Sequence, residues 1–431
     1  MPTIPTVFLT APTLEDRFKP KDKAIEGLKR VNKIDFSGNI YLSNKDSNTD
    51  MILVKQGDLL ISGINVEKGA VAVYDGQEDV TATIHNSSYE FDDEKIDVEF
   101  LKLFLKSPEF LNAIKEQVPG GIKTEIKPKH LLPLEIVIPE LDDQKEVVEK
   151  FSSFHSKQNS IETELNHQLA LAKELRQAYL REAMQGRLAR QDERDEPAEI
   201  LLEKIKAEKE KLVAEKRIRR DKPLPPINAE EIPFEIPSNW TWCRLGEIAE
   251  MCLGKMLDQV KNKGELQPYL RNVNVRWGSF DLSDLKEMRF TEDEEERFSA
   301  IYGDLIICEG GEPGRAAIWK GEQPIKIQKA VHRVRTNKQA LQSEYLYYCL
   351  LTDATSKRLN EYFTGGGIQH FTGKSLSKYA IPLPPLAEQE RIVAKLEKLM
   401  KFCDELEANI RQGKARADQL LQTALKEALQ D

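Results

Sequence analysis

Residues 313–335 combine six Lys and Arg side chains with one acid, Glu322, which leaves this stretch with a net excess of five positive charges. Cations at this density suit the phosphates of a nucleic acid, and Arg can also hold a guanine edge through two hydrogen bonds. The segment "LRNVN" at 270–274 adds two asparagines, and Asn is the side chain that matches adenine. The candidate DNA contacts in this part of the chain are Arg271, Asn272, Asn274, Arg315, Lys329 and Arg333.

Two glycine-containing loops carry further candidates. The first, "FTGGGIQHFTGKSLSK" at 363–378, contains no acid, and the second is "VPGGIKTEIKPKH" at 118–130. Glycine lets the backbone approach a ligand closely, while Gln, His, Thr and Lys can reach base edges or phosphates. The alternatives are a tight turn for each glycine run and ordinary solvated surface for each basic side chain. The candidate DNA contacts in these loops are Gln369, His370, Thr372 and Lys374, and Lys123, Thr124, Lys127 and Lys129.

Motifs for catalysis are missing from the sequence. There is no P-loop, no F-x-G-x-G of the S-adenosylmethionine type, no tetrapeptide resembling D-P-P-Y and no H-E-x-x-H. The segment "EIK" at 125–127 lacks the upstream Pro-Asp that a nuclease metal site would need. The five cysteines include no C-x-x-C pair, which argues against zinc and against a disulfide framework. We therefore predict no catalytic residue and no metal site in this chain.

The elements that must position these residues occur twice. The segment "IPELDDQKEVVEKF" at 138–151 returns as a similar proline-to-helix junction around "PLPPLAEQERIV" at 382–393. The matched pairs, each 245 residues apart, are Pro139 and Pro384, Leu141 and Leu386, Gln144 and Gln389, Val148 and Val393, and Lys150 and Lys395. A period this long indicates two copies of a whole domain with its appended helix, because solenoid repeats are far shorter.

Each copy ends in an amphipathic helix. The prolines at 382, 384 and 385 fix φ and donate no N–H, so a helix cannot begin before Leu386. Heptad positions counted from Val147 and Ile392 are mostly apolar over about 40 residues, which predicts two helices of roughly 60 Å that lie against one another. The alternative is two separate helices that each pack on their own domain.

The composition is that of a globular protein, with 431 residues, 40% hydrophobic content and a net charge of -9. Taken alone, this charge argues against a nucleic-acid partner. No stretch approaches the roughly 20 apolar residues that span a bilayer, and the first residues do not resemble a signal peptide, so we expect a cytoplasmic protein without membrane contact. Short β-like runs such as "GAVAVYDG" alternate with helical patches, which predicts an α+β fold with a curled sheet in each copy.

The combination of "IPSNWTWCRLGEI", "GDLIICEGGEPGRAAI" and "IPLPPLAEQERIV" with duplication of the whole chain resembles the specificity subunit of type I restriction-modification systems. This resemblance implies two target-recognition domains that each read half of a bipartite DNA sequence, separated by two long helices that form an antiparallel coiled coil. Nothing before Leu28 matches "NWTWCRLGEI", so the first domain starts differently from the second.

The resemblance also implies a division of the chain. The charged helix in the connector is expected to be a solvated spacer, and the prolines that follow form a stiff lead-in to the second domain. The expected segments are target-recognition domains at 1–142 and 237–386, spacer helices at 143–186 and 387–431, and a connector at 187–236.

The implied partners are double-stranded DNA, two methyltransferase subunits and restriction/translocase subunits. No cofactor is expected in this non-catalytic chain, whereas S-adenosylmethionine, ATP and Mg are expected on the partner subunits. Two other classes stay open. A coiled-coil adaptor without DNA binding is favoured by the acidic total and disfavoured by the duplicated glycine loops, and a self-contained DNA enzyme is disfavoured by the missing motifs.

Overall fold

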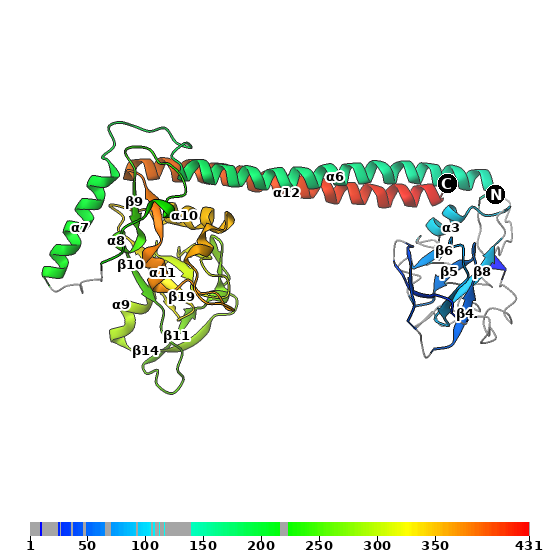
Figure 1. Cartoon of the computed structure of the whole chain (residues 1–431), viewed down its shortest axis with the longest axis horizontal. Coiled ribbons are helices and arrows are strands. Elements are labelled where there is room, and N and C mark those ends of the chain that lie inside the picture. The colour runs from blue at the N-terminus through cyan, green and yellow to red at the C-terminus, as the bar shows by residue number, and fades with distance from the viewer. Residues whose placement is uncertain are drawn as a thin grey trace. The chain divides into compact units, whose positions relative to one another are not determined.

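The computed structural model divides into two compact units, which are described separately (Figure 1). The first contains Met1–Asn166 and Arg411–Asp431, and the second contains His167–Ile410. Helices α6 (Leu141–Met184) and α12 (Leu386–Gln430) contribute to both units. The structure describes residues 9–10, 27–35, 38–45, 49–64, 70–91, 94–104, 139–215 and 223–430, with the single residues Ile25, Ser107, Asn112 and Glu116.

Two four-stranded sheets make up the described part of the first globular domain. Their strands are β1 (Leu9–Thr10), β2 (Arg30–Ile34), β3 (Ile40–Ser43), β4 (Met51–Val54), β5 (Leu59–Ser62), β6 (Val71–Val73), β7 (Val80–Thr83) and β8 (Asn86–Phe91), and helix α3 (Val98–Phe104) follows them. One sheet has the antiparallel order β1-β8-β5-β6. The other has the order β3-β2-β7-β4, in which only β2 and β7 run parallel. Ile52, Leu60 and Ala72 are buried in the core that both sheets share.

The second domain repeats this topology. Its strands are β10 (Ala249–Leu253), β11 (Glu265–Leu270), β14 (Lys286–Phe290), β15 (Ser299–Ala300), β16 (Leu305–Cys308), β17 (Ala316–Ile318), β18 (Ile325–Ile327) and β19 (Val331–Thr336). The orders are β10-β19-β16-β17 and β14-β11-β18-β15, and again one pair, β11 and β18, is parallel. Two short pairs supplement them, β12 (Val275–Arg276) with β13 (Ser279–Phe280) and β9 (Thr241–Arg244) with β20 (Ala380–Leu383).

Seven helical segments complete the second domain. Helix α10 (Ser343–Thr355) buries Tyr345, Leu346 and Leu350 in the core of the second unit. The others are short: α8 (Leu245–Ile248), η3 (Asn272–Asn274), the turn η4 (Glu292–Glu294) with α9 (Glu295–Phe298), η5 (Arg358–Tyr362) and α11 (Gly373–Lys378).

Individual contacts also recur at the 245-residue offset. The Tyr74 hydroxyl donates to the carbonyl of Glu78 over 2.8 Å, and the Trp319 indole donates to the carbonyl of Gln323 over 3.0 Å. Tyrosine and tryptophan differ in shape, yet each closes the same four-residue turn. The duplication seen in the sequence is therefore a duplication of backbone structure.

A buried glutamine joins the second domain to its helix, and we call this connection the joint. Gln389 lies in the first turn of α12 and has no exposed surface. Its amide nitrogen donates to the carbonyls of Ala340 (2.9 Å) and Pro384 (3.0 Å), and its amide oxygen accepts from the backbone N–H of Gln342 (3.0 Å). Three well-formed hydrogen bonds satisfy this buried amide, which would otherwise destabilise the fold.

The first domain has the same joint. Gln144, in the first turn of α6, is also fully buried and donates to the carbonyls of Lys95 and Pro139, both at 2.9 Å. Its amide oxygen accepts from the backbone N–H of Asp97 at 2.7 Å. Each partner lies 245 residues before its counterpart in the second domain. The sequence repeat around Gln389 therefore corresponds to a repeated set of hydrogen bonds between a domain and its helix.

The two long helices begin at equivalent residues, Leu141 and Leu386, two residues after Pro139 and Pro384. For α12 this agrees with the prediction that no helix begins before Leu386. Within each unit they run antiparallel. In the first unit the Lys414 ammonium contacts Glu162 at 2.7 Å, and in the second the Arg176 guanidinium contacts Asp404 at 2.7 Å. Among the described residues, no helix is long and apolar enough to cross a membrane.

Burial along the predicted seam differs between the units. In the second unit Ala172, Cys403 and Ile410 are buried, as a coiled-coil seam requires. In the first unit Ile161 and Leu420 remain 48% and 70% exposed. The heptad pattern therefore predicts the pairing of the helices, but their seam is closed more completely in the second unit.

The connector helix α7 (Ala198–Ala214) is more than the solvated spacer that its charge suggests. Ala198, Leu201, Leu202 and Ile205 are buried in the core of the second unit, together with residues of α8. The expectation was wrong because four apolar residues at helical spacing are enough to dock a helix whose other faces are charged. Figure 1 shows α7 at the edge of this unit.

We expect Gln389→Ala to destabilise the second unit by about 2–4 kcal/mol, because one N–H and two carbonyls would be buried without partners. All four tryptophans lie between residues 240 and 319, so their fluorescence during urea unfolding reports on the second unit. The exposed neighbour Glu390 provides a control, since Glu390→Ala should change the stability by less than about 0.5 kcal/mol. Equal stability of the Gln389→Ala variant and the parent chain would show that these hydrogen bonds do not contribute to the free energy of unfolding.

Candidate nucleic-acid interface

Loops of the second domain meet around the turn that follows β16. The backbone N–H of Glu309 donates to the carbonyl of Ala330 (2.9 Å), and the N–H of Phe371 donates to the carbonyl of Glu309 (2.7 Å). The Asn272 amide donates to the carbonyl of Gly310 (3.2 Å). These contacts join four segments, which we call the loop surface: residues 271–274, 309–315, 328–330 and 364–374.

Two glycines at the centre of this surface lie where a larger residue would contact its neighbours too closely. Gly311 has a φ of +82°, and a Cβ built there would lie 2.5 Å from the Asn272 amide nitrogen. A Cβ at Gly310 would lie 3.1 Å from Nδ1 of His370. The backbone of Gly310 and Gly311 therefore lies directly against His370 and Asn272, two of the predicted contact residues. The candidate contacts predicted from the sequence did not include these glycines, although the pattern "EGGEPG" at 309–314 is the signal that could have identified them.

Four predicted contacts are exposed on the loop surface: Lys329, Gln369, His370 and Lys374. Gln369 lies in a short hairpin closed by two backbone hydrogen bonds between Thr364 and His370, at 2.8 and 2.9 Å. Thr372, also predicted as a contact, instead caps helix α11 by accepting from the N–H of Ser375 at 3.3 Å. The hairpin and the cap hold polar side chains in defined positions.

Two predicted arginines of the loop surface are already paired with acids. Arg315 contacts Glu312 at 2.6 Å and donates to the carbonyl of Asn272 at 2.9 Å. Arg271 contacts Asp284 at 2.8 Å, and Lys286 together with Arg271 lowers the pKa of that carboxyl. A phosphate would therefore have to compete with a carboxylate for either guanidinium.

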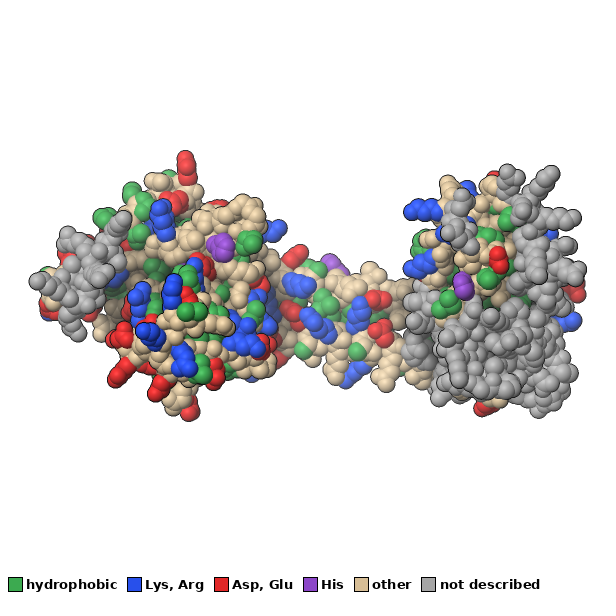
Figure 2. Space-filling view, turned by 90° about the horizontal axis from the view of Figure 1, so that it is seen from below, with side chains coloured by type: hydrophobic (Ala, Val, Ile, Leu, Met, Phe, Trp, Pro, Cys, Tyr) green, Lys and Arg blue, Asp and Glu red, His purple; other side chains and the backbone are tan. Residues whose placement is uncertain are grey.

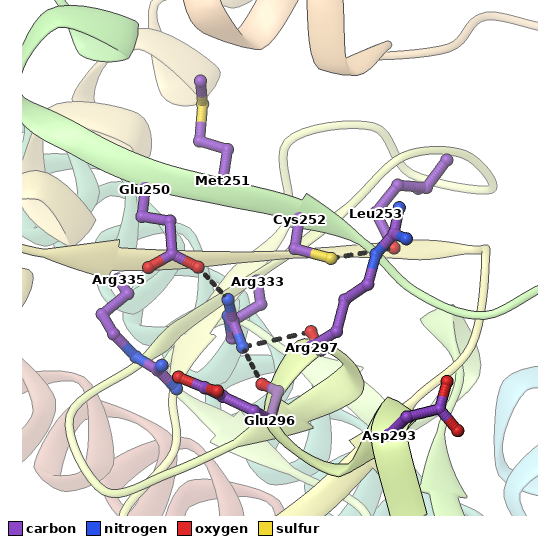
Figure 3. A pocket seen from close by; sticks show the side chains of 9 residues that line it. All are labelled: Glu250, Met251, Cys252, Leu253, Asp293, Glu296, Arg297, Arg333 and Arg335. Carbon is purple, nitrogen blue, oxygen red and sulfur yellow. Dashed lines mark hydrogen bonds and ion pairs between the residues drawn. The ribbon is translucent and has the colours of Figure 1, made fainter. Parts of the chain in front are cut away.

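Arg333 and Asn274 are corrections to the predicted contact set. Both are 2% exposed. Arg333 lines a pocket of about 460 Å³, where it pairs with Glu250 and donates to the carbonyl of Glu296 at 2.9 Å (Figure 3). Asn274 donates to the carbonyl of Asp281 at 3.0 Å and so closes a turn. Neither side chain is available to a base edge.

Part of the excess positive charge of residues 313–335 does not reach the surface, because several of its cations are buried or paired with acids. Lys326 is 3% exposed and contacts Glu295 at 2.5 Å, and Arg335 contacts Asp304 at 2.7 Å. Figure 2 shows Lys and Arg side chains over the middle of one face of the second unit, with acidic side chains toward its edge. The positive charge that reaches solvent is therefore local.

The candidates in the first domain, Lys123, Thr124, Lys127 and Lys129, lie outside the described residues. Among the residues that the structure describes, no group of three or more His, Cys, Asp or Glu side chains could hold a metal ion.

A buried histidine holds the loop surface against β19. The ring nitrogen Nε2 of His332 lies 2.9 Å from the carbonyl oxygen of Phe371, and the side chain is 1% exposed. Burial lowers the pKa of His332 below its ordinary value of 6.5, although the Phe371 carbonyl and Glu309 oppose this shift. The neutral ring therefore fits the folded state better than the charged ring.

We expect the second unit to lose stability as the pH falls below about 6.5, because the unfolded histidine then takes up a proton that the folded one resists. The loss continues until the pH reaches the lowered pKa of the folded state, at about 1.4 kcal/mol for each unit of depression. Urea unfolding at pH 7.5 and 5.5 tests this. The His332→Gln variant should show a smaller pH dependence, and an identical dependence in both proteins would assign it to other groups.

Comparison with known proteins agrees with this organisation. The family model for the type I restriction modification DNA specificity domain matches residues 8–171 and 237–413, one match for each copy. The EcoAI specificity subunit of Escherichia coli, a type I restriction enzyme subunit, is 27% identical over 416 residues, covering 83% of this chain and 69% of that protein. The EcoEI specificity subunit of the same species is 28% identical over 274 residues, covering 60% of this chain and 44% of that protein.

Solved structures show the same fold. A chain from a structural study of complex assembly and conformational transition of the type I R-M system gives a TM-score of 0.63 at 17% identity, covering 98% of this chain and 95% of its own. The HsdS subunit from Thermoanaerobacter tengcongensis gives 0.59 at 17% identity, covering 96% and 93%. The predicted α+β architecture with two domains and two long helices is confirmed, and an adaptor without a DNA role finds no support. With both copies matched, the chain belongs to the type I restriction modification DNA specificity family.

Proposed function

We propose that the chain is the sequence-specific DNA-recognition subunit of a type I restriction-modification complex and reads a bipartite target through its two domains. The observation that carries this proposal is the duplicated joint, in which Gln144 and Gln389 each fix a domain on a long helix. Two domains of equal topology, each locked to a helix, are suited to reading two separate half-sites.

The loop surface supplies the chemistry of recognition in the second domain. The exposed ammonium groups of Lys329 and Lys374 bind phosphates and fix the position of the duplex. The amide of Gln369, exposed in the hairpin loop, contacts base edges, for which it carries both a donor and an acceptor. Arg315 exchanges Glu312 for a phosphate or a guanine when DNA arrives.

Chemistry on the DNA belongs to partner subunits in this proposal. Two methyltransferase subunits bring S-adenosylmethionine, and restriction/translocase subunits bring ATP and Mg, while this chain acts as a scaffold in the cytoplasm without catalysing a step. The absence of methyltransferase and nucleotide-binding motifs from the sequence supports this assignment. The relatives are specificity subunits, which disfavours the alternative of a self-contained DNA enzyme.

The test uses the purified chain and a random duplex library, with and without the methyltransferase subunit from the same source. We expect mobility-shifted duplexes to be enriched in two short sequence blocks separated by a constant gap. Methyl transfer from S-adenosylmethionine should appear only when the methyltransferase is present. Methyl transfer by the chain alone, or a shifted fraction without sequence enrichment, would refute the proposal.

We expect Gln369→Ala to relax specificity in one half-site only, by about 1–3 kcal/mol for a lost base contact. Lys374→Ala should weaken binding to all sequences and reduce the slope of log affinity against log salt by about 1. Binding titrations at several salt concentrations on duplexes mutated in either half-site measure both effects. The control is Lys398→Ala, because Lys398 is exposed on α12, away from the loop surface in the sequence. A Gln369→Ala effect spread equally over both half-sites would contradict independent reading by two domains.

A further inference from the structure

The loop between β10 and β11 presents an apolar tip to solvent. Val260 is 90% exposed, Met256 58% and Leu257 44%. Single exposed aliphatic side chains are common on protein surfaces and need no explanation. Three of them within five consecutive residues form a protruding apolar feature. Its exposure to water is unfavourable, and binding to a partner would remove that exposure.

The tip is ordered by its own hydrogen bonds. The Asp258 carboxylate accepts from the backbone N–H groups of Val260 (3.1 Å) and Lys261 (3.0 Å). The N–H of Asn262 donates to the carbonyl of Asp258 (2.9 Å), and its side-chain amide donates to the carbonyl of Met256 (3.1 Å). This single turn holds Val260 at the apex and prevents it from folding back onto the domain.

Both ends of the loop are anchored to β14 and the segment that follows it. Lys255 is 8% exposed, donates to the carbonyl of Arg289 at 2.9 Å and pairs with Glu294. At the other end Gly264 has a φ of +96° and lies so close to the Phe290 carbonyl that a Cβ would clash with it. The tip therefore stands on a fixed base.

Cationic side chains flank the tip, and the loop adjoins the loop surface. Lys261 and Lys263 are exposed, and the only acid near Lys261 in its own turn is Asp258, at 3.6 Å. An exposed pair of this kind is weak and is easily exchanged for a phosphate. The backbone N–H of Lys329, one of the exposed cations of the loop surface, donates to the carbonyl of Lys255 at 2.9 Å.

We infer that residues 256–263 form a wedge that distorts the DNA half-site read by the second domain. Val260 inserts between two base pairs, Met256 and Leu257 cover the opened edge, and Lys261 and Lys263 hold the flanking phosphates. Apolar side chains inserted at a base step partly unstack it, and the energy of this deformation depends on the step. The wedge thus adds readout through DNA deformability, and the inference rests on the proposed function.

A fluorescence experiment tests the wedge on the full chain with its methyltransferase partner. The probe is a duplex selected from the random library, with 2-aminopurine placed at successive positions of the second half-site. We expect fluorescence to rise at one base step on binding, because unstacking relieves its quenching. Val260→Ser should remove this rise and weaken binding about tenfold, which corresponds to the lost burial of one valine side chain.

Ile301→Ser is the matched control, since Ile301 is 44% exposed outside the loop, and it should leave both fluorescence and affinity unchanged. Tight binding of the selected duplex without any rise in fluorescence would overturn the wedge and leave DNA recognition intact. If Val260→Ser instead impairs assembly with the methyltransferase and leaves DNA binding unchanged, the loop is a protein-docking element and the inference is wrong. If no duplex is selected at all, the proposed function and the wedge are both refuted.

Discussion

The proposed reading of two half-sites requires each globular domain to be fixed on its long helix, and in this chain a buried amide supplies that constraint. Gln389 contacts three backbone groups on two segments of its domain, so rotation of α12 about its axis would break all three hydrogen bonds together. The prolines before the helix remove the backbone freedom that could absorb such a rotation. Gln144 repeats the arrangement in the first domain.

The distribution of charge explains how an acidic chain can present a surface to DNA. In the stretch 313–335, Lys326 and Arg333 are used inside the domain, where both contact α9 and Arg333 also pairs with Glu250 of β10. Lys329, by contrast, faces solvent beside the Gly310 turn. Specific contacts on this surface therefore come from few side chains in fixed positions, and the net charge of -9 says little about them.

The repeat, the start of each long helix and the α+β class could be predicted from the sequence because they depend on local rules. Proline interrupts the interior of a helix whatever the tertiary structure. The offset between the two copies can be counted directly in the sequence. Burial of individual cations could not be predicted in this way. Strand β19, "VHRVRT", has four polar residues out of six, as a largely exposed strand would, yet five of the six are buried because neighbouring elements cover both faces. Asn274 likewise has the residue type of an adenine reader but holds a turn, which depends on distant carbonyls.

The partners of the two glutamines are all main-chain atoms: the carbonyls of Lys95, Pro139, Ala340 and Pro384, and the N–H groups of Asp97 and Gln342. Lysine stands in one copy where alanine stands in the other, and the joint is unchanged. A bond to the main chain places no demand on which side chain occupies the position. The joint therefore holds two domains that differ in side chains at these positions, and it constrains the backbone of a domain without constraining the surface that the domain presents.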